Sequence, residues 1–354
     1  MPSEPARSTS DRTPISGDAP DGVEQESCAS VRIRALETSD EDAAVAALTR
    51  AFDLAPDAPL RVPGAWRRRY FENPAGTRAM VAVDAAGRVL AQYAGLPQDA
   101  WIDGERTTIT QGVDSLADPE LGRGLGSLFV RVGKRFAQDH GGRLGDGDPF
   151  MWGYPVREAW RIGRRLLGYA TIRSQLALVA RVDDLREGNA AGVRVQEVTG
   201  FPAELDEWFA SFRARYAAIC ERTRSTLAWR YEGQPQRRYR IALASVDGEL
   251  RGLAVGRAVV LEGARRFALC EWLVDDATRG ALLGWAAGAA REEGTDELYA
   301  WLPPWCDDFL ALQHAGFRVH PTSRVLVGHS YDRRRPAEWY AANWYTTLGD
   351  TDLL

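Results

Sequence analysis

The chain has 354 residues, of which 45% are hydrophobic and 26% charged, and this composition is typical of a folded protein rather than a disordered one. The length suits two domains of about 150 residues each. A net charge of -5 gives no electrostatic reason to expect nucleic acid or an anionic membrane as a partner. No stretch approaches about 18 uninterrupted apolar residues, so we expect no membrane span.

The four cysteines and four histidines are widely scattered and show no metal-ligand spacing. We therefore expect no metal site, and thiols that remain reduced. The N-terminus has no apolar core of the kind found in signal peptides, which predicts a cytoplasmic protein. Residues 1–29 are rich in Ser, Pro, Asp, Glu and Gly, and we expect them to form a disordered tail.

Hydrophobic periodicity predicts an α/β unit that begins near residue 31. Three consecutive antiparallel strands are expected after an opening strand and helix, because turn signals at Gly87 and Asp103-Gly104 separate the alternating runs. The expected elements, in chain order, are a strand at 31–34, a helix that ends near 52, strands at 79–83, 89–101 and 107–116, a helix from 128, a strand at 150–154 and a helix at 157–167.

The second half of the sequence repeats the first at a distance of 161 residues. The matching positions are Arg69-Tyr70 with Arg230-Tyr231, Pro74 with Pro235, Gly87 with Gly248, and Gly95 with Gly256. The repeat predicts a first domain at 30–180, a polar linker at 181–193, a second domain at 194–330 and an aromatic C-terminal tail at 331–354.

A glycine-rich segment lies between the expected strand at 107–116 and the next helix. It reads Leu121-Gly122-Arg123-Gly124-Leu125-Gly126-Ser127. Glycines lack the Cβ atoms that keep an anion from the main chain, and the N–H groups at a helix start can bind a pyrophosphate. A Rossmann site would need a parallel sheet, and a P-loop would need a Gly-Lys-Ser/Thr ending, so a coenzyme A loop remains.

In this context the sequence resembles the GNAT acetyltransferase superfamily, whose loop reads Gln/Arg-x-x-Gly-x-Gly/Ala after the fourth strand. Leu121 stands where that family has Gln or Arg. The resemblance implies two tandem GNAT-like domains, each a mixed, mostly antiparallel sheet flanked by helices. It also implies that acetyl-CoA, or another acyl-CoA, is the co-substrate and is bound by Leu116, Ala117 and the Leu121–Ser127 loop. The tandem layout is similar to Eis-type, mycothiol-synthase-type and FemX-like proteins.

The resemblance implies direct attack of an amine on the thioester, with N–H groups of the fourth strand polarising its carbonyl. Asp114 is the best-placed base, although a turn or capping role explains it equally well. The family often has an acidic Tyr where this chain has Arg164. Either Arg164 stabilises the leaving thiolate, or Tyr154, Tyr169 or water protonates it; Arg164 as a solvated helix charge is the plainer reading.

The second copy has no glycine loop, since Asp275 leads through polar residues directly into a helix. We therefore expect it not to bind coenzyme A. In one interpretation of the second copy, Glu271 and Asp275 hold a cationic substrate; in the other, the copy is a structural partner that covers the open sheet edge. The aromatic tail, which also carries Asp350 and Asp352, either contacts a sugar or fastens itself to the domain surface.

Together these patterns predict acetyl transfer from acetyl-CoA to a primary amine of a small molecule or an amino sugar. Two alternatives stay open at this point. One is a FemX-like aminoacyl transferase that uses aminoacyl-tRNA, which the acidic balance disfavours. The other is a coenzyme A sensor or scaffold without catalysis. The sequence does not predict the oligomeric state.

Overall fold

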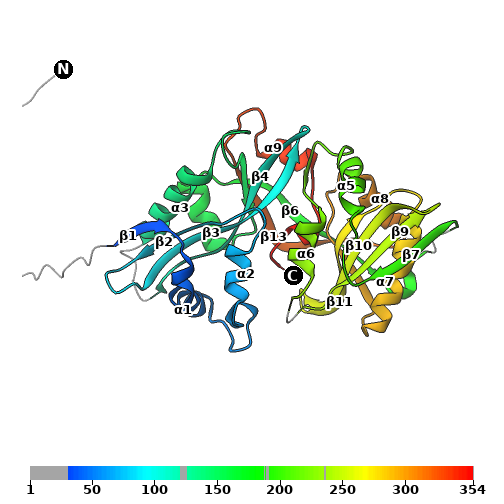
Figure 1. Ribbon diagram of the computed structural model, residues 1–354, viewed down its shortest axis with the longest axis horizontal. Helices are drawn as coiled ribbons and strands as arrows, with labels where there is room; N and C mark the ends of the chain where they lie inside the picture. The colour runs from blue at the N-terminus through cyan, green and yellow to red at the C-terminus, as the bar shows by residue number, and fades with distance from the viewer. Residues whose placement is uncertain (1–30, 120–125, 187, 189–190, 235–236, 354) are drawn as a thin grey trace, which may run out of the picture.

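The computed structural model describes residues 31–119, 126–186, 188, 191–234 and 237–353. Two α/β lobes lie side by side, and β6, β13 and the C-terminal segment run between them (Figure 1). The fold class predicted from the sequence, two tandem GNAT-like domains built on mixed sheets, is confirmed by this arrangement.

The elements of the first lobe follow the predicted order closely. Helix α3 buries Leu128, Val132 and Phe136 and so packs through the apolar stripe that periodicity identified, whereas α1 buries Ala44, Ala47 and Leu48 and leaves Phe52 exposed. The elements are β1 (Arg32–Ala35), α1 (Glu41–Phe52), α2 (Ala65–Phe71), β2 (Arg78–Val83), β3 (Val89–Ile102), β4 (Glu105–Ala117), α3 (Gly126–His140), β5 (Phe150–Gly153), α4 (Arg157–Leu166) and β6 (Ala170–Arg181), with short 3-10 helices η1 (Thr38–Asp40) and η2 (Pro59–Arg61).

The second lobe repeats this order, and the chain then returns to the middle of the molecule. Its elements are η5 (Val182–Asp184), β7 (Val193–Val198), α5 (Leu205–Arg213), β8 (Ala218–Cys220), α6 (Arg224–Tyr231), β9 (Arg240–Val246), β10 (Glu249–Leu261), β11 (Ala264–Leu273), α7 (Arg279–Glu292), β12 (Glu297–Ala300), α8 (Asp307–His314), β13 (Arg318–Ser330), α9 (Ala337–Asn343), β14 (Trp344–Tyr345) and η6 (Leu348–Asp350).

The two lobes exchange a strand. Strand β6, at the end of the first half, pairs with β12 of the second, whereas β13, at the end of the second half, pairs with β5 of the first. Because β6 and β13 also pair with each other, the strands β1-β2-β3-β4-β5-β13-β6-β12-β11-β10-β9-β7 form one continuous sheet. The predicted domain boundary at residue 181 coincides with the end of β6, which belongs by pairing to the second lobe.

The structural equivalents of the repeat are visible at the matched residues. Gly87 and Gly248 occupy the turns β2–β3 and β9–β10, and both have a positive φ, 81° and 87°, which glycine adopts without strain. Helices α2 and α6 meet between the lobes, where Arg68 Nη2 donates to the carbonyl of Trp229 and the Trp229 indole N–H donates to the carbonyl of Arg68. These two residues are themselves one repeat apart.

Helices cover both faces of the first sheet. Helices α1 and α2 pack on one face through Leu48, Trp66 and Tyr70, and α3 packs on the other through Val132 and Phe136. Within the described part of the chain, no helix is both long and apolar enough to cross a bilayer.

The aromatic tail is part of the core. Tyr340, Trp344 and Tyr345 are each no more than 2% exposed, and the Tyr340 ring stacks on Phe150 with 3.7 Å between ring centres. Strand β14 pairs with β8, which in turn pairs with β3, so strand pairing fixes the tail between the lobes. These buried rings fasten the segment and do not contact a sugar.

Candidate functional site

Strands β4 and β5 separate where the sheet changes from antiparallel to parallel pairing. They pair only at Thr110 with Met151 and at Gln111 with Trp152, although β4 continues to residue 117. Two glycines flank the point of separation, and a Cβ atom on Gly153 would lie 3.1 Å from the carbonyl oxygen of Gly112. Beyond it, the edge of β4 that faces β5 has no strand partner among the described residues.

A β-bulge interrupts β4 at the same place. The register with β3 shifts between Gln92 and Ala94, and Asp114 adopts a φ of 46°. The side-chain amide of Gln92 donates to the Asp114 carbonyl oxygen at 3.0 Å, which holds the bulge. Such a bulge redirects side chains and main-chain groups, and here it directs them toward the gap between the strands.

A cavity of about 300 Å³ occupies this gap. We call it the donor cavity. Its walls come from the α1–α2 connection, β4, β5, α4, β13 and the C-terminal segment. The lining residues include Phe52, Leu54, Leu60, Tyr93, Gly112, Val113, Asp114, Ser115, Phe129, Trp152, Gly153, Tyr154, Pro155, Val156, Ala159, Tyr169, Val327, Gly328, Asp352 and Leu353.

Asp114 lines the donor cavity and is held by two residues of α2. Arg69 Nε donates to Asp114 Oδ2 at 2.8 Å, and the Tyr70 hydroxyl donates to the same oxygen at 2.5 Å. Burial raises the pKa of Tyr70, and the Asp114 charge raises it further, so the hydroxyl keeps its proton. Burial alone would lower the pKa of Arg69, but Asp114 and Asp352 outweigh it and raise this pKa, so the guanidinium stays charged.

Asp352 is a second carboxylate at the site, and it comes from the far end of the chain. Its Oδ2 lies 3.1 Å from Arg69 Nη2, and its Oδ1 accepts a hydrogen bond from Gln111 Nε2 at 2.7 Å. Sequence patterns recorded Asp352 only as one of the carboxylates of the tail. No local signal joins it to Arg69 and Gln111, which precede it by more than 200 residues.

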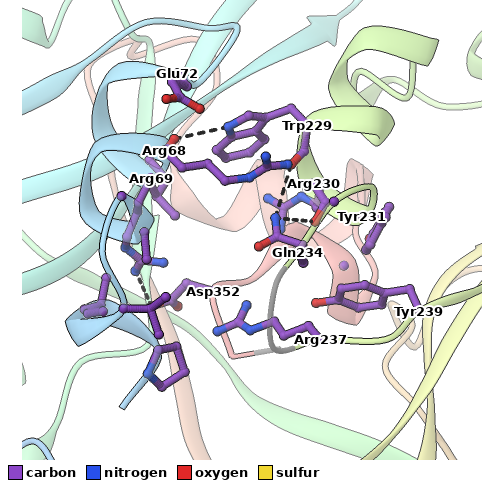
Figure 2. A pocket seen from close by; sticks show the side chains of 18 of the residues that line it. Arg68, Arg69, Glu72, Trp229, Arg230, Tyr231, Gln234, Arg237, Tyr239 and Asp352 are labelled. Atoms are coloured by element: carbon purple, nitrogen blue, oxygen red, sulfur yellow. Dashed lines mark hydrogen bonds and ion pairs between the residues drawn. The ribbon is translucent and has the colours of Figure 1, made fainter. Parts of the chain in front are cut away.

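A second cavity, of about 310 Å³, lies between the lobes beside α2 and α6, and we call it the acceptor cavity. Leu60 and Asp352 line both cavities, so the two meet at these residues. Figure 2 shows Arg68 and Arg69 on one side of the acceptor cavity, with Arg237 and Tyr239 opposite. Its other lining residues include Pro59, Val62, Pro63, Gly64, Ala65, Glu72, Leu96, Trp229, Arg230, Tyr231, Gly233, Gln234, Cys270, Gly349 and Thr351.

Three tyrosines border the donor cavity. The Tyr154 hydroxyl donates a hydrogen bond to Gln175 Oε1 at 2.9 Å, whereas the hydroxyls of Tyr93 and Tyr169 share a short hydrogen bond with each other. The hydrogen bond between Tyr93 and Tyr169 uses the proton of one hydroxyl, so the proton of the other hydroxyl can be donated to a group in the cavity. Burial raises the pKa of each of the three hydroxyls, so each keeps its proton at neutral pH.

The structure therefore brings Asp114, Tyr154 and Tyr169 together around one cavity, but not Arg164. Arg164 lies on an exposed stretch of α4, with its guanidinium 5.5 Å from the centre of the Trp160 ring, and it lines neither cavity. This placement matches the reading of Arg164 as a solvated helix charge.

The predicted coenzyme A loop is only partly described. Leu121, Gly122, Arg123, Gly124 and Leu125 lie outside the described residues, and helix α3 begins at Gly126, followed by Ser127. Of the two residues predicted ahead of the loop, Leu116 is 4% exposed and packs in the core beside α1, and Ala117 is the exposed last residue of β4.

Glu271 and Asp275, the carboxylates predicted to hold a substrate, are both engaged by protein groups. Glu271 is 2% exposed and accepts from Arg222, Tyr231 and Thr347. Asp275 accepts hydrogen bonds from the backbone N–H and the hydroxyl of Thr278 and pairs with Arg251 at 2.7 Å. Neither lines the acceptor or the donor cavity.

Other reactive side chains are placed away from the two cavities or buried. Cys220, Cys270 and Cys306 are free and buried. Among the residues that the structure describes, no group of His, Cys, Asp and Glu is arranged to bind a metal ion.

Comparison with known proteins shows similarity in structure. No protein-family model matches the sequence, and no curated protein is similar to it in sequence. A GCN5-related N-acetyltransferase from Kribbella flavida superposes with a TM-score of 0.62 at 20% identity, over 84% of this chain and 70% of that one. Eis1 from Mycobacterium abscessus superposes with a TM-score of 0.55 at 14% identity, over 86% and 74%.

A third similar structure is Saccharomyces cerevisiae N-myristoyltransferase with bound myristoyl-CoA, with a TM-score of 0.53 at 10% identity, over 88% of this chain and 84% of that one. The matches span most of both chains, including both lobes. The protein thus has the tandem fold of the GCN5-related N-acetyltransferases, as the resemblance in its sequence implied.

Proposed function

We propose that the protein is an acyl-CoA-dependent N-acyltransferase that moves an acetyl group from acetyl-CoA to the primary amine of a small molecule. The observation that carries the proposal is the meeting of two cavities at Leu60 and Asp352. A donor in the gap between β4 and β5 and an acceptor between the lobes would present their reacting atoms to each other at this junction, as catalysis by proximity requires.

The residues of the donor cavity fit an acyl-CoA. Gly112 and Gly153 lie close together at the point where β4 and β5 diverge. The largely apolar walls of the cavity beyond them suit a pantetheine arm and a short acyl chain. Leu121–Ser127 would hold the pyrophosphate, since it precedes α3 and is rich in glycine. An acyl-CoA supplies the activated thioester. The free edge of β4 after Gly112 would donate N–H groups to the acyl oxygen.

The proton movements can be assigned to residues at the junction. Asp352 accepts the proton that the amine loses as its nitrogen bonds to the acyl carbon, because it is the carboxylate that borders both cavities. Arg69 and Gln111 hold this carboxylate in place. Tyr169 donates a proton to the sulfur as the carbon–sulfur bond breaks, and the products are an amide and free coenzyme A.

Asp114 has a positioning role in this scheme. Its carboxylate fixes Arg69 and Tyr70, and Arg69 in turn contacts Asp352. The sequence-based choice of Asp114 as the base thus remains a prediction, and exchange of each carboxylate for its amide distinguishes the two assignments.

Calorimetric titration of acetyl-CoA and coenzyme A into the wild type and Gly124→Glu tests the proposal. The new side chain should obstruct the pyrophosphate site and abolish binding. Gly284→Glu is the matched control, because Gly284 lies on the exposed face of α7, where a Cβ meets no atom within 4 Å. Failure of the wild type to bind either compound would refute the proposal.

A further inference from the structure

The acceptor cavity is rich in positive charge. Four arginines line it, Arg68, Arg69, Arg230 and Arg237, against two carboxylates, Glu72 and Asp352. Asp352 forms an ion pair with Arg69, and Glu72 is an exposed residue. The described lining of the cavity therefore contains more arginines than carboxylates.

Arg68 and Arg230 are held by neutral groups. Arg68 Nη2 donates to the carbonyls of Trp229 and Glu232 at 2.7 and 2.8 Å, and Arg230 Nη1 donates to the carbonyl of Thr351 at 3.1 Å. Within the described part of the chain, neither arginine forms an ion pair with a carboxylate. Arg68 Nε is buried and has no hydrogen-bond partner there. These carbonyls orient the guanidinium groups without neutralising them, so the cavity favours an anion.

Aromatic surface and a further hydrogen-bond donor also line the cavity. Trp229 and Tyr239 line the cavity, and Figure 2 shows Tyr239 and Arg237 extending into it from the same segment. No hydrogen bond joins the Tyr239 hydroxyl to another described residue. Guanidinium groups, a phenol and an indole around one cavity suit a small molecule with both an acidic group and apolar surface.

We infer that the acceptor is an amine that also carries an anionic group, a carboxylate or a phosphate, on the same molecule. Its amine end lies at Asp352, and its anionic end is bound by Arg230 and Arg237. This inference rests on the proposed acyl transfer and uses the same step. It replaces the sequence-based prediction that Glu271 and Asp275 hold a cationic acceptor, because the oxygens of these carboxylates already accept hydrogen bonds from protein groups.

Matched pairs of amines test the inference with the full chain. Tyrosine and tyramine differ by a carboxylate, and phosphoethanolamine and ethanolamine differ by a phosphate. Coenzyme A release from acetyl-CoA gives kcat/KM for each amine, and calorimetry gives its Kd for the coenzyme A-loaded protein. We expect at least one anionic member to bind or react about 10-fold or more better than its partner, since a hydrogen bond to a charged group is worth roughly 1.5–3 kcal/mol. The pair that shows the preference identifies the anion.

Two variants locate the anion. Arg230→Gln and Arg237→Gln should each lower the preference for the anionic amine over its uncharged partner about 10-fold or more. Arg238→Gln is the control, because Arg238 is exposed, adjacent in sequence and outside the acceptor cavity. A melting temperature equal to that of the wild type shows that each variant is folded.

The two hypotheses fail separately. If acetyl-CoA binds but no anionic amine binds or reacts better than its uncharged partner, the inference is overturned and the proposed function stands. The inference is also overturned if the preference survives in both Arg230→Gln and Arg237→Gln. If acetyl-CoA does not bind, the proposed function itself is refuted.

Discussion

Each of the two lobes contains a hydrogen-bonded pair of a tyrosine and a carboxylate, and the two pairs lie in different environments. In the first, Tyr70 of α2 donates to Asp114 of β4, and this carboxylate lines an open cavity. In the second, Tyr231 of α6 donates to Glu271 of β11, which is buried with Arg222 and Asp350. The carboxylate of the first pair thus lines a cavity, whereas the carboxylate of the second is buried.

The C-terminal segment accounts for much of this difference. Residues of η6 pack against β11, and Gly349 lies so close to Tyr231, Glu271 and the Cys270 carbonyl that a Cβ would clash with all three. The same segment then continues to Asp352, which reaches the cavity of the first lobe. A repeated fold can therefore keep a cavity in one copy and lose it in the other when a single segment fills one cleft and contributes to the other.

The largest expected effect is on stability and comes from the buried Tyr231–Glu271 pair of the second lobe. Glu271→Gln leaves Arg222 without one of its two buried partners, and breaking a buried ion pair costs about 3–5 kcal/mol of unfolding free energy. Urea denaturation measures this loss. Asp114→Asn, at the equivalent Tyr–carboxylate pair, should cost less because its site is more open. Equal losses of unfolding free energy at the two positions would contradict the difference in environment between the two pairs.

In the first lobe, beside the donor cavity, we expect an effect on catalysis. Asp352→Asn should lower kcat about 10²–10³-fold, within the range for loss of a general base, and leave the affinity for acetyl-CoA unchanged. Steady-state coenzyme A release with an accepted amine measures it. A larger kcat loss in Asp114→Asn than in Asp352→Asn would return the base to the residue chosen from the sequence.

The donor side gives a smaller effect. Tyr169→Phe should lower kcat about 10–100-fold, at or below the usual range for a general acid, because water partly replaces the hydroxyl. Tyr154→Phe should lower it less than 3-fold, roughly a 0.6 kcal/mol change, since the Tyr154 hydroxyl already donates its hydrogen bond to Gln175. A reversed order of the two variants would assign the acid to Tyr154.

The smallest effect concerns Asp275, which precedes α7 where the first lobe has its glycine loop. Burial alone would raise its pKa, but hydrogen bonds from Thr278 and Arg251 outweigh burial and lower it. Asp275→Ala should cost about 1 kcal/mol, as for loss of a helix cap, without changing kcat. Because the pKa is lower in the folded state, ionised Asp275 stabilises the fold above about pH 4, and this contribution disappears as the pH falls through the lowered pKa.

Unfolding of the wild type and Asp275→Ala at pH 7 and pH 3 tests this sign. The difference in unfolding free energy should shrink at pH 3. A difference that grows on acidification, or a loss of kcat in the variant, would show that Asp275 does not act as a structural cap.

Sequence patterns predicted the elements that local periodicity defines. The stripe of Val132 and Phe136 on α3 and the turn glycines Gly87 and Gly248 were sufficient for the order of helices and strands and for the repeat. The exchange of β6 and β13 was not predictable, because alternation identifies a strand but not its partner.

Part of the candidate site could be predicted from the sequence. Asp114 was chosen by its place near the end of an expected strand, and Tyr154 and Tyr169 through the family resemblance; all three border the donor cavity. Asp352 and the arginines of the acceptor cavity were missed, because they meet only when α2, α6 and the C-terminal segment pack together. Isolated charges far apart in sequence carry no signal of such a meeting.

A crystal structure of the protein with acetyl-CoA tests whether only the first lobe binds the acyl donor. We expect electron density for the pantetheine arm between β4 and β5, with the acetyl group beside Asp352, and no coenzyme A at β11 and α7. Coenzyme A bound in the second lobe, or an acetyl group remote from the junction at Leu60 and Asp352, would contradict the division of roles between the two copies.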